Sequence, residues 1–412
     1  MKQNTLIAFG SVPKDGGTFT FYKNLRKPLL AHGIDLRCVS VGKREAQLWE
    51  HSYADEGCVL LAENVSSIKK QSQVFTQWCA DEGVDIVFGV NSIAILSALP
   101  HLPSHIRVMA RCANAFDHGY RITMSCHERL NRVVALAPRQ ITDLVSSYGA
   151  DERRIVLIPN GTSVERFASA ANKKRGTQQS LRLGFLGRLE HNQKGVLYLP
   201  DVLNRLQERG VEFSLSIAGK GVHESTLRQQ FKNHIEAGTV KFVGALKREE
   251  IAGYFSNIDV YLFPSQFEGS PNALIEALMA GCVPAAWKLK GITDFVVEDG
   301  ATGVLADLGD CEGLADAISM LANDRERLKA LSAQAYESAR KRFSRERLIS
   351  DYVKLINEVM AEPPLPWQVK DWQQFNVDPA FRQPAWKKMI PPPLKTLAKQ
   401  IMYSLRMDSL GE

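Results

Sequence analysis

The chain has 412 residues, of which 45% are hydrophobic and 23% charged, and its net charge is +6. This length predicts two domains and this composition a soluble globular enzyme. No apolar run is long enough to span a membrane or to form a signal peptide. The mild positive charge does not indicate nucleic acid, and seven dispersed cysteines without a Cys-x-x-Cys pair favour reduced thiols in the cytoplasm over a metal site.

In the first half of the chain, short apolar runs alternate with amphipathic stretches, the pattern of a parallel α/β sheet. A polar stretch, residues 169–180, predicts a linker, so we expect the first domain at residues 1–170. Within it, strands are predicted at residues 5–12, 36–41, 84–90, 107–111, 133–137 and 155–158, and helices at 18–32, 67–82 and 139–148.

The second half repeats the pattern and predicts a second domain at residues 181–345. The helical stretch 346–360 is expected to cross back to the first domain. Strands are predicted at residues 181–187, 213–218, 240–243 and 260–263, and helices at 195–209, 223–235, 248–256, 272–280, 312–342 and 344–360.

Two glutamates, Glu268 and Glu276, lie eight positions apart in a segment predicted to form a strand, a loop and a helix. The apolar run 260–263 predicts the buried strand, and the helix is expected to have Ser270 as its cap and Pro271 in its first turn. Free N–H groups between the two glutamates would then form an anion site. The loop with Glu268 follows the carboxyl end of the strand, and ligands of open α/β sheets bind at the carboxyl ends of the strands.

This segment resembles the E-x7-E motif of retaining glycosyltransferases of family 4. These enzymes have the GT-B fold, in which two Rossmann-like domains face each other across a cleft. The resemblance continues through residues 291–294 and 298–303. Lys290 and Asp294 depart from the family, which has a glycine and a glutamate there. An ordinary strand-loop-helix with two solvent-facing acids is the alternative.

Two cations follow the first strand of the second domain, in Gly187-Arg188 and Lys194-Gly195. An arginine fork and a lysine point charge suit a diphosphate, which gains charge as it leaves. In the family that the chain resembles, the corresponding residues contact the donor diphosphate. Two surface cations on a loop are the alternative.

Weaker segments resemble the family elsewhere. Gly16 and Gly17 follow the first predicted strand, as in the family's double-glycine loop, and a plain turn is equally compatible. Gly219 ends the second strand of the second domain, where the backbone is expected to approach the nucleotide. Leu246 lies in a segment that meets the base in the family. Residues 158–167 resemble the family's Pro-Asn-Gly segment, which we interpret as a structural turn.

His118 lies in a loop after the strand predicted at residues 107–111. Many family members carry a histidine in this loop, close to the transferred sugar. The family's histidine is usually followed by Asp or Glu, whereas Asp117 precedes His118 here. An ordinary surface histidine is the alternative to a catalytic role.

The resemblance implies a retaining transfer of sugar from a nucleotide-sugar to an acceptor, in the assembly of a bacterial lipopolysaccharide or exopolysaccharide. Glu276 would bind the ribose, where two carboxylate oxygens suit a diol. Arg188 and Lys194 would bind the diphosphate. Glu268 would hold the transferred sugar, and no side chain is assigned as a nucleophile. The loop after Glu268 would take part in this site through Gly269, Ser270, Pro271, Asn272 and Ala273.

No Asp-x-Asp pair occurs in the sequence. We therefore expect a metal-independent enzyme without a cofactor, in which fixed cations and a helix N-terminus stabilise the diphosphate. Two alternatives remain open. One is another GT-B enzyme, such as a nucleotide-sugar epimerase or a phosphorylase. The other is a non-catalytic scaffold that uses a degenerate sugar-nucleotide site to bind a partner.

Residues 363–412 form a Pro- and Trp-rich basic tail that is not expected to form a core domain. Residues 382–406 contain six basic residues and no acidic one, and their apolar residues recur at helical spacing. This predicts an amphipathic helix on an anionic membrane, which would place the protein at the inner face of the cell membrane beside a lipid-linked acceptor. A helix docked on the first domain is the alternative.

Overall fold

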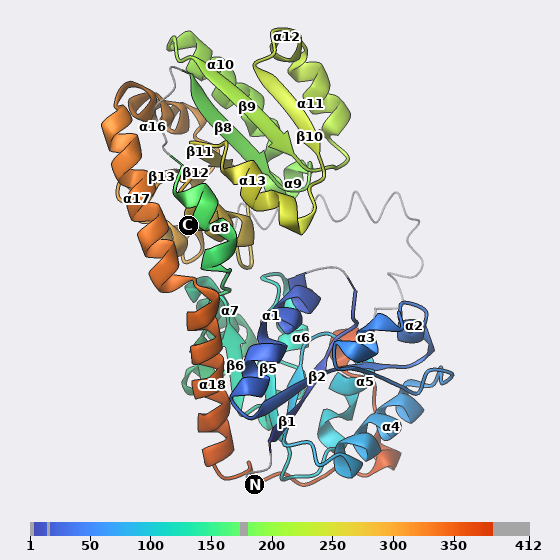
Figure 1. The fold of residues 1–412 in the computed structure, drawn as a ribbon. Helices are drawn as coiled ribbons and strands as arrows, with labels where there is room; N and C mark the ends of the chain where they lie inside the picture. The colour runs from blue at the N-terminus through green and yellow to red at the C-terminus, as the bar shows by residue number, and fades with distance from the viewer. Residues whose placement is uncertain (1–3, 15–16, 174–179, 382–412) are drawn as a thin grey trace. The chain divides into compact units, whose positions relative to one another are not determined.

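The computed structural model describes residues 4–14, 17–173 and 180–381 (Figure 1). The chain folds into two compact units. The first unit contains the chain up to Asn160 and the described residues from Arg345 to Phe381. The second unit contains Gly161–Ser344.

The first boundary lies about ten residues before the predicted one at residue 170. Helix α8 (Val164–Ala171), which the sequence pattern does not predict, packs against α13 (Ile251–Phe255) and α14 (Asn272–Met279) and therefore belongs to the second unit. The polar stretch predicted as a linker begins inside this helix, and its residues 174–179 lie outside the described residues.

The first unit is built on a seven-stranded parallel sheet in the order β3-β2-β1-β4-β5-β6-β7. Every strand predicted for this half is present, and β3 is an addition. The order reverses between β1 and β4, which is where ligands bind in sheets of this type. The strands are β1 (Thr5–Gly10), β2 (Ile34–Val41), β3 (Cys58–Leu61), β4 (Ile86–Gly89), β5 (Arg107–Arg111), β6 (Arg132–Ala135) and β7 (Ile155–Leu157).

Helices cover this sheet and bury apolar side chains on both of its faces. The helix that follows the second unit, α18 (Arg345–Ala361), packs on α1, and its Tyr352 lies edge-on to Phe21 at 5.3 Å between ring centroids. The other helices are α1 (Gly17–Ala31), α2 (Lys43–Ala46), α3 (Ser52–Asp55), α4 (Ile68–Asp81), α5 (Ile93–Ala98), α6 (Asp117–Thr123) and α7 (Pro138–Tyr148).

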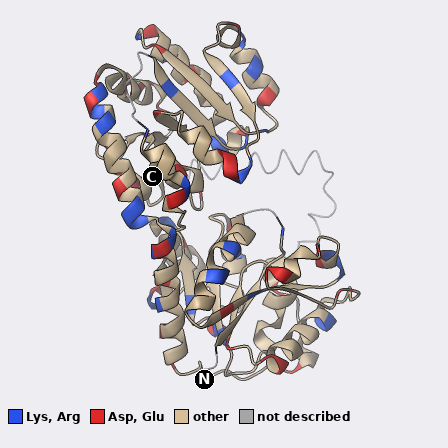
Figure 2. Ribbon diagram, viewed as in Figure 1, with Lys and Arg blue, Asp and Glu red and all other residues tan. Residues whose placement is uncertain are grey.

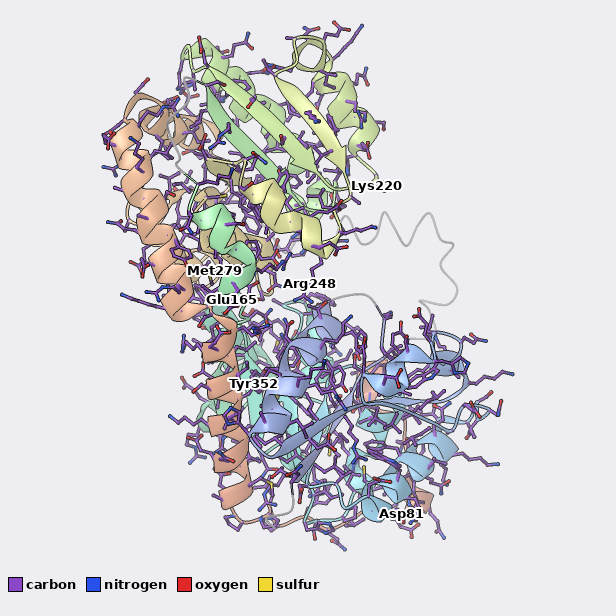
Figure 3. All side chains as sticks on the ribbon, in the orientation of Figure 1. Asp81, Glu165, Lys220, Arg248, Met279 and Tyr352 are labelled. Atoms are coloured by element: carbon purple, nitrogen blue, oxygen red, sulfur yellow. The ribbon has the colours of Figure 1, made fainter. Side chains whose placement is uncertain are left out.

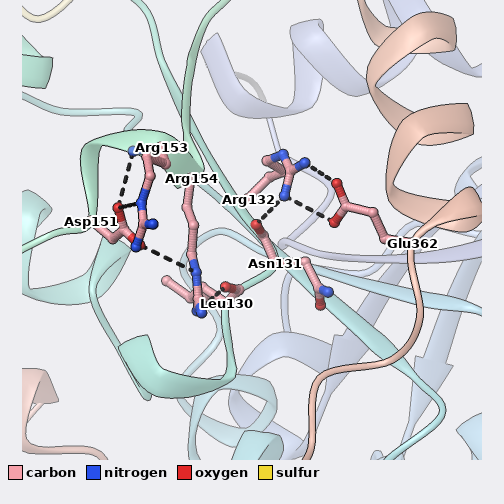
Figure 4. Close-up of polar contacts among 7 residues, drawn as sticks. All are labelled: Leu130, Asn131, Arg132, Asp151, Arg153, Arg154 and Glu362. Carbon is pink, nitrogen blue, oxygen red and sulfur yellow. Dashed lines mark hydrogen bonds and ion pairs between the residues drawn. The ribbon is translucent and has the colours of Figure 1, made fainter.

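Residues 362–381, which we call the strap, continue from α18 across the first unit. The strap begins at an ion pair between Glu362 and Arg132 of β6 (Figure 4). Arg107 of β5 also donates to the Glu362 carbonyl oxygen at 2.7 Å. Two strands of the sheet therefore fix the start of the strap.

The strap then packs on the end of α5 and the turn that follows it. The buried His101 ring stacks on Trp372 at 4.2 Å between ring centroids, and its Nδ1 lies 2.7 Å from the Lys370 carbonyl oxygen. The Asp378 amide donates to Ser97 Oγ at 3.0 Å. The described part of the tail is thus a packed component of the first unit. The amphipathic helix predicted at residues 382–406 lies outside the described residues.

The second unit has a six-stranded parallel sheet in the order β10-β9-β8-β11-β12-β13. Its order reverses between β8 and β11. The sequence pattern does not predict β12 and β13, and β12 contains a proline and two alanines, which are weak strand formers. The strands are β8 (Leu181–Leu186), β9 (Phe213–Ala218), β10 (Val240–Gly244), β11 (Val260–Phe263), β12 (Val283–Trp287) and β13 (Val304–Ala306).

Helices also cover both faces of this sheet. The helix predicted at residues 312–342 is two helices, because Asp324 ends the first and its carboxylate caps the second by accepting from the Arg327 amide. The helix predicted at 223–235 is likewise divided. Besides α8, α13 and α14, the helices are α9 (His191–Lys194), α10 (Leu199–Glu208), α11 (Glu224–Gln230), α12 (Lys232–Glu236), α15 (Thr293–Val296), α16 (Cys311–Asn323) and α17 (Arg325–Arg342).

Charge is interspersed along the helices (Figure 2). On α17, for example, Lys329 pairs with Glu326 and Arg340 with Glu337. All seven cysteines are free thiols, and Cys126 is the least buried of them. None of the helices in the described ranges is long and apolar enough to cross a membrane.

Candidate functional site

Two loops meet where the strand order of the second unit reverses. One follows β8 and the other follows β11. Gly195 makes this contact possible, because a Cβ atom there would lie 1.8 Å from the Pro264 carbonyl oxygen, and its φ of 61° suits glycine. The Gln266 amide also donates to the Gln193 carbonyl oxygen at 2.8 Å. The two loops are thus held against each other by backbone contacts.

This contact brings together a cation and a carboxylate that the sequence predicts for the site. Lys194 Nζ lies 2.5 Å from Glu268 Oε1. The Glu268 side chain is only 6% exposed. A carboxylate at this depth requires a partner, because an isolated buried charge is strongly unfavourable. Lys194 supplies that partner, although the two residues are 74 positions apart in the chain.

Arg188 lies on the same loop as Lys194 and is exposed. Its guanidinium donates to Gln193 Oε1. Between Arg188 and Lys194, Glu190 caps the short helix α9, which ends at Lys194. The Glu190 carboxylate accepts from the Asn192 and Gln193 amides. The loop after β8 therefore presents two basic side chains, one exposed and one paired with Glu268.

A third loop, after β9, packs against the first. Gly219 has a φ of 138°, and a Cβ atom there would lie 1.8 Å from the Gly187 carbonyl oxygen. The Lys220 carbonyl accepts from the Leu189 amide at 3.0 Å, and Figure 3 labels Lys220 at this edge of the sheet. Gly219 is therefore required for packing between the loops, and its approach to a nucleotide stays a prediction. Leu246 lies on the loop after β10 and is half-buried.

Helix α14 begins at Asn272, as predicted, but the residues before it do not have the predicted roles. Pro271 occupies the N-cap position, no side chain caps the helix, and Asn272 is its first residue. The predictions that Ser270 caps the helix and that Pro271 lies in its first turn are therefore wrong. The reason is the backbone of Pro271, whose φ of −81° and ψ of 71° are not helical.

Glu276 lies in the second turn of α14, and its partner is a residue that the sequence pattern does not predict. Arg166 of α8 donates from Nη1 to Glu276 Oε1 at 3.1 Å, and both side chains are largely buried. Burial raises the pKa of the Glu276 carboxyl, and Arg166 and Arg248 oppose this increase. Arg166 belongs to the segment interpreted as a structural turn, where nothing in the sequence indicates a partner 110 positions away.

The positions that depart from the family lie beside β12. The Asp294 carboxylate accepts from the Gly291 amide at 2.7 Å, and Lys290 is exposed. Asp294 therefore holds its own loop in place.

Three predicted site residues, Gly16, Gly17 and His118, belong to the first unit. Gly17 is the first residue of α1, and Gly16 lies outside the described residues. His118 is in the first turn of α6, is exposed, and lies edge-on to Phe381 of the strap at 6.1 Å between ring centroids. Their roles stay predictions.

The second unit thus presents two cations and two carboxylates where its strand order reverses. Cations of this kind suit a diphosphate, and carboxylates suit hydroxyl groups. Residues 180–324, which include all four, match the family model described as Glycosyl transferases group 1.

Comparisons with known proteins agree with this match. The chain is 30% identical over 213 residues to the glycogen synthase of Mycobacterium tuberculosis, covering 52% of this chain and 48% of that protein. It is 32% identical over 213 residues to the phosphatidyl-myo-inositol mannosyltransferase of Mycobacterium leprae, covering 51% and 55%. The chain thus spans about half the length of the curated relatives it matches.

A solved structure matches over most of the chain. HepE from Anabaena in complex with UDP has a TM-score of 0.70 and 18% identity, covering 86% of this chain and all of that chain. The two parallel sheets and this similarity define a GT-B fold, as the sequence predicts. Together with the match of residues 180–324, they support a glycosyltransferase family with this fold.

Proposed function

We propose that the protein is a glycosyltransferase that moves a sugar from a nucleotide-sugar to a glycan or lipid-linked acceptor. The observation that carries this proposal is the Lys194–Glu268 pair, which sits beside Arg188 where the strand order of the second unit reverses. The match of residues 180–324 to a glycosyltransferase family supports it.

In this proposal each group of the site has one task. Lys194 and Arg188 bind the donor diphosphate, and Glu276 accepts hydrogen bonds from the ribose hydroxyls. Lys194 is then shared between the diphosphate and Glu268, which holds the transferred sugar together with the loop before α14. In the first unit, His118 would act on the transferred sugar, and Gly16 and Gly17 would contribute to donor binding.

The reaction is proposed to proceed with retention and without a metal. Lys194 and Arg188 carry fixed positive charge where the diphosphate gains negative charge as it leaves. No side chain is assigned as a nucleophile, so departure of the diphosphate and attack of the acceptor would occur on the same face of the sugar. The anomeric configuration of the product, measured by NMR, tests this point, and inversion would contradict it.

The acceptor is proposed to be a bacterial cell-surface glycan, assembled at the cytoplasmic face of the membrane. The two curated relatives are named for a polysaccharide and for a phospholipid, which supports acceptors of these classes. Residues 382–406 would contact anionic lipid. Flotation with anionic vesicles at low salt, using the full chain and a chain without residues 381–412, tests the contact. Full-length protein that stays at the bottom of the gradient would contradict it.

A thermal-shift panel of nucleotide-sugars tests the donor. A cognate donor at 100 times its Kd stabilises the protein by about 2.7 kcal/mol, so its melting temperature should rise clearly. Sugar transfer to an acceptor should then accompany release of the nucleoside diphosphate. Release of free nucleotide without transfer, or a requirement for phosphate, would instead indicate an epimerase or a phosphorylase. No shift with any donor would favour the scaffold.

A further inference from the structure

Arg166 lies at a junction of three segments of the second unit. It is in the first turn of α8, where Ser163 Oγ accepts from the Arg166 amide at 3.1 Å. Its Nη1 donates to Glu276 on α14, and its Nη2 donates to the Arg248 carbonyl oxygen just before α13. Figure 3 labels Arg248 and Glu165, the neighbour of Arg166. Arg166 therefore joins the helix that carries Glu276 to the segment after β10.

Both contacts depend on the shape of the guanidinium group. The Arg166 side chain is only 18% exposed, and its guanidinium carbon lies 4.8 Å from the centroid of the Phe167 ring. The planar group donates in two directions at once, to a carboxylate and to a carbonyl. A lysine at this position has a single ammonium group. It could make one of the two contacts, but it is not suited to make both at once.

The ion pair leaves part of the Glu276 carboxylate available. Arg166 bonds to Oε1, and no group among the described residues bonds to Oε2. A carboxylate oxygen can accept two hydrogen bonds. Glu276 can therefore keep its contact with Arg166 while Oε2 accepts from a ligand.

We propose that Arg166 is a positioning residue of the donor site, which holds the Glu276 carboxylate in place for the ribose hydroxyls and links it to the segment after β10. This inference rests on the proposed donor site. Arg166 would not touch the reacting atoms, and it would act through Glu276.

Because Glu276 is buried among charged and titratable groups, the effect of Arg166 on donor binding should depend on pH. Burial raises the pKa of the Glu276 carboxyl, and Arg166 and then Arg248 lower it in part. Tyr261 of β11 also faces Glu276, and burial raises the pKa of its phenol, so it stays neutral. Without Arg166 the pKa of Glu276 should rise further. The Glu276 carboxyl would then stay protonated up to a higher pH than in the wild type. In that pH range the ribose hydroxyls would lack a charged acceptor.

Calorimetric titration at a series of pH values from about 5 to about 8 tests the proposal, because burial raises the pKa of the Glu276 carboxyl toward this range. The probe is the nucleoside diphosphate, among UDP, GDP and ADP, that binds the wild-type chain. Arg166→Gln should weaken binding about tenfold or more at the acidic end, and less at the alkaline end. The pH at which affinity is half-maximal should be higher than in the wild type. Arg166→Lys should restore part of the affinity.

The matched control is Arg209→Gln, which removes a half-buried arginine of the same unit that pairs with Asp316 and Glu312. It should leave affinity and its pH profile unchanged. Equal affinity and an equal pH profile in Arg166→Gln and the wild type would overturn the inference. A loss of the same size at every pH would also overturn it, since that indicates a purely structural role.

Two further outcomes of the titration can be told apart from these. If none of the diphosphates binds the wild-type chain, the proposed function fails and the inference fails with it. If Arg166→Gln does not fold, Arg166→Lys carries the test, because it keeps the charge and loses one contact. Affinity of Arg166→Lys equal to that of the wild type at every pH would then count against the inference, because this variant lacks one of the two contacts of Arg166.

Discussion

The ion pair between Lys194 and Glu268 leads to a prediction in which the effect on stability and the effect on ligand binding are measured separately. Lys194→Met removes the partner of a carboxylate that is 6% exposed. Breaking a buried ion pair from one side destabilises a protein by about 3–5 kcal/mol. For a unit of this size, each kcal/mol lowers the melting temperature by about 2–4 °C, so we expect a decrease of about 6–20 °C.

A second variant shows whether the unpaired charge is the cause. Lys194→Met combined with Glu268→Gln removes both charges and keeps the volume of each side chain nearly unchanged. Replacing both partners of such a pair can be close to neutral, so the double variant should recover most of the lost melting temperature. It should not recover binding of a nucleoside diphosphate, because the cation for the diphosphate is still missing.

Differential scanning calorimetry and calorimetric titration provide the two measurements. Lys329→Met is the control, since Lys329 pairs with Glu326 on the surface of α17 and such exposed pairs contribute about 0–1 kcal/mol. The reasoning is refuted if Lys194→Met lowers the melting temperature no more than Lys329→Met does. It is also refuted if the double variant is no more stable than Lys194→Met alone.

Three further predictions concern the donor, the metal and the strap. Glu276→Ala should weaken donor binding by about 1.5–3 kcal/mol, through loss of a charged hydrogen-bonding partner, and an unchanged Kd by calorimetry would reject the ribose assignment. Transfer activity should persist in excess chelator; an enzyme silenced by chelator and rescued by Mn²⁺ or Mg²⁺ would contradict this. Trp372→Ala should destabilise the first unit by about 1–3 kcal/mol, because Trp372 stacks on the buried His101. Hydrogen exchange should then become faster in α5 and in Leu99–His101, and unchanged exchange there would mean that the strap does not stabilise this region.

The local framework of the site could be predicted from the sequence. The apolar run of β11, the loop with Glu268 and the helix with Glu276 are each encoded within a few residues, and the structure contains all three. The alternation of strands and helices likewise predicted two parallel sheets. These predictions succeeded because hydrophobic periodicity is a local signal.

The ion pairs of the site could not be predicted in this way. Lys194 and Glu268 are 74 positions apart, and Arg166 and Glu276 are 110 positions apart. Their contacts depend on how the loops after β8 and β11 pack and on where α8 docks. Both depend on long-range packing, which the hydrophobic pattern of one segment does not contain.

The strap shows a different limit. Its prolines disfavour α-helices and strands, and this composition suggested a segment outside any core. In the structure, Trp367 Nε1 donates to the Pro100 carbonyl at 3.1 Å, and Trp372 stacks on His101. Side-chain contacts therefore fix a segment that the backbone pattern alone describes as irregular.

A crystal structure of the full chain with the nucleoside diphosphate that raises its melting temperature most would test the central claim most directly. We predict that the diphosphate lies within hydrogen-bonding distance of Lys194 and Arg188, with the ribose hydroxyls on Glu276. A nucleotide bound elsewhere in the second unit, or one that touches neither Lys194 nor Glu276, would contradict the account.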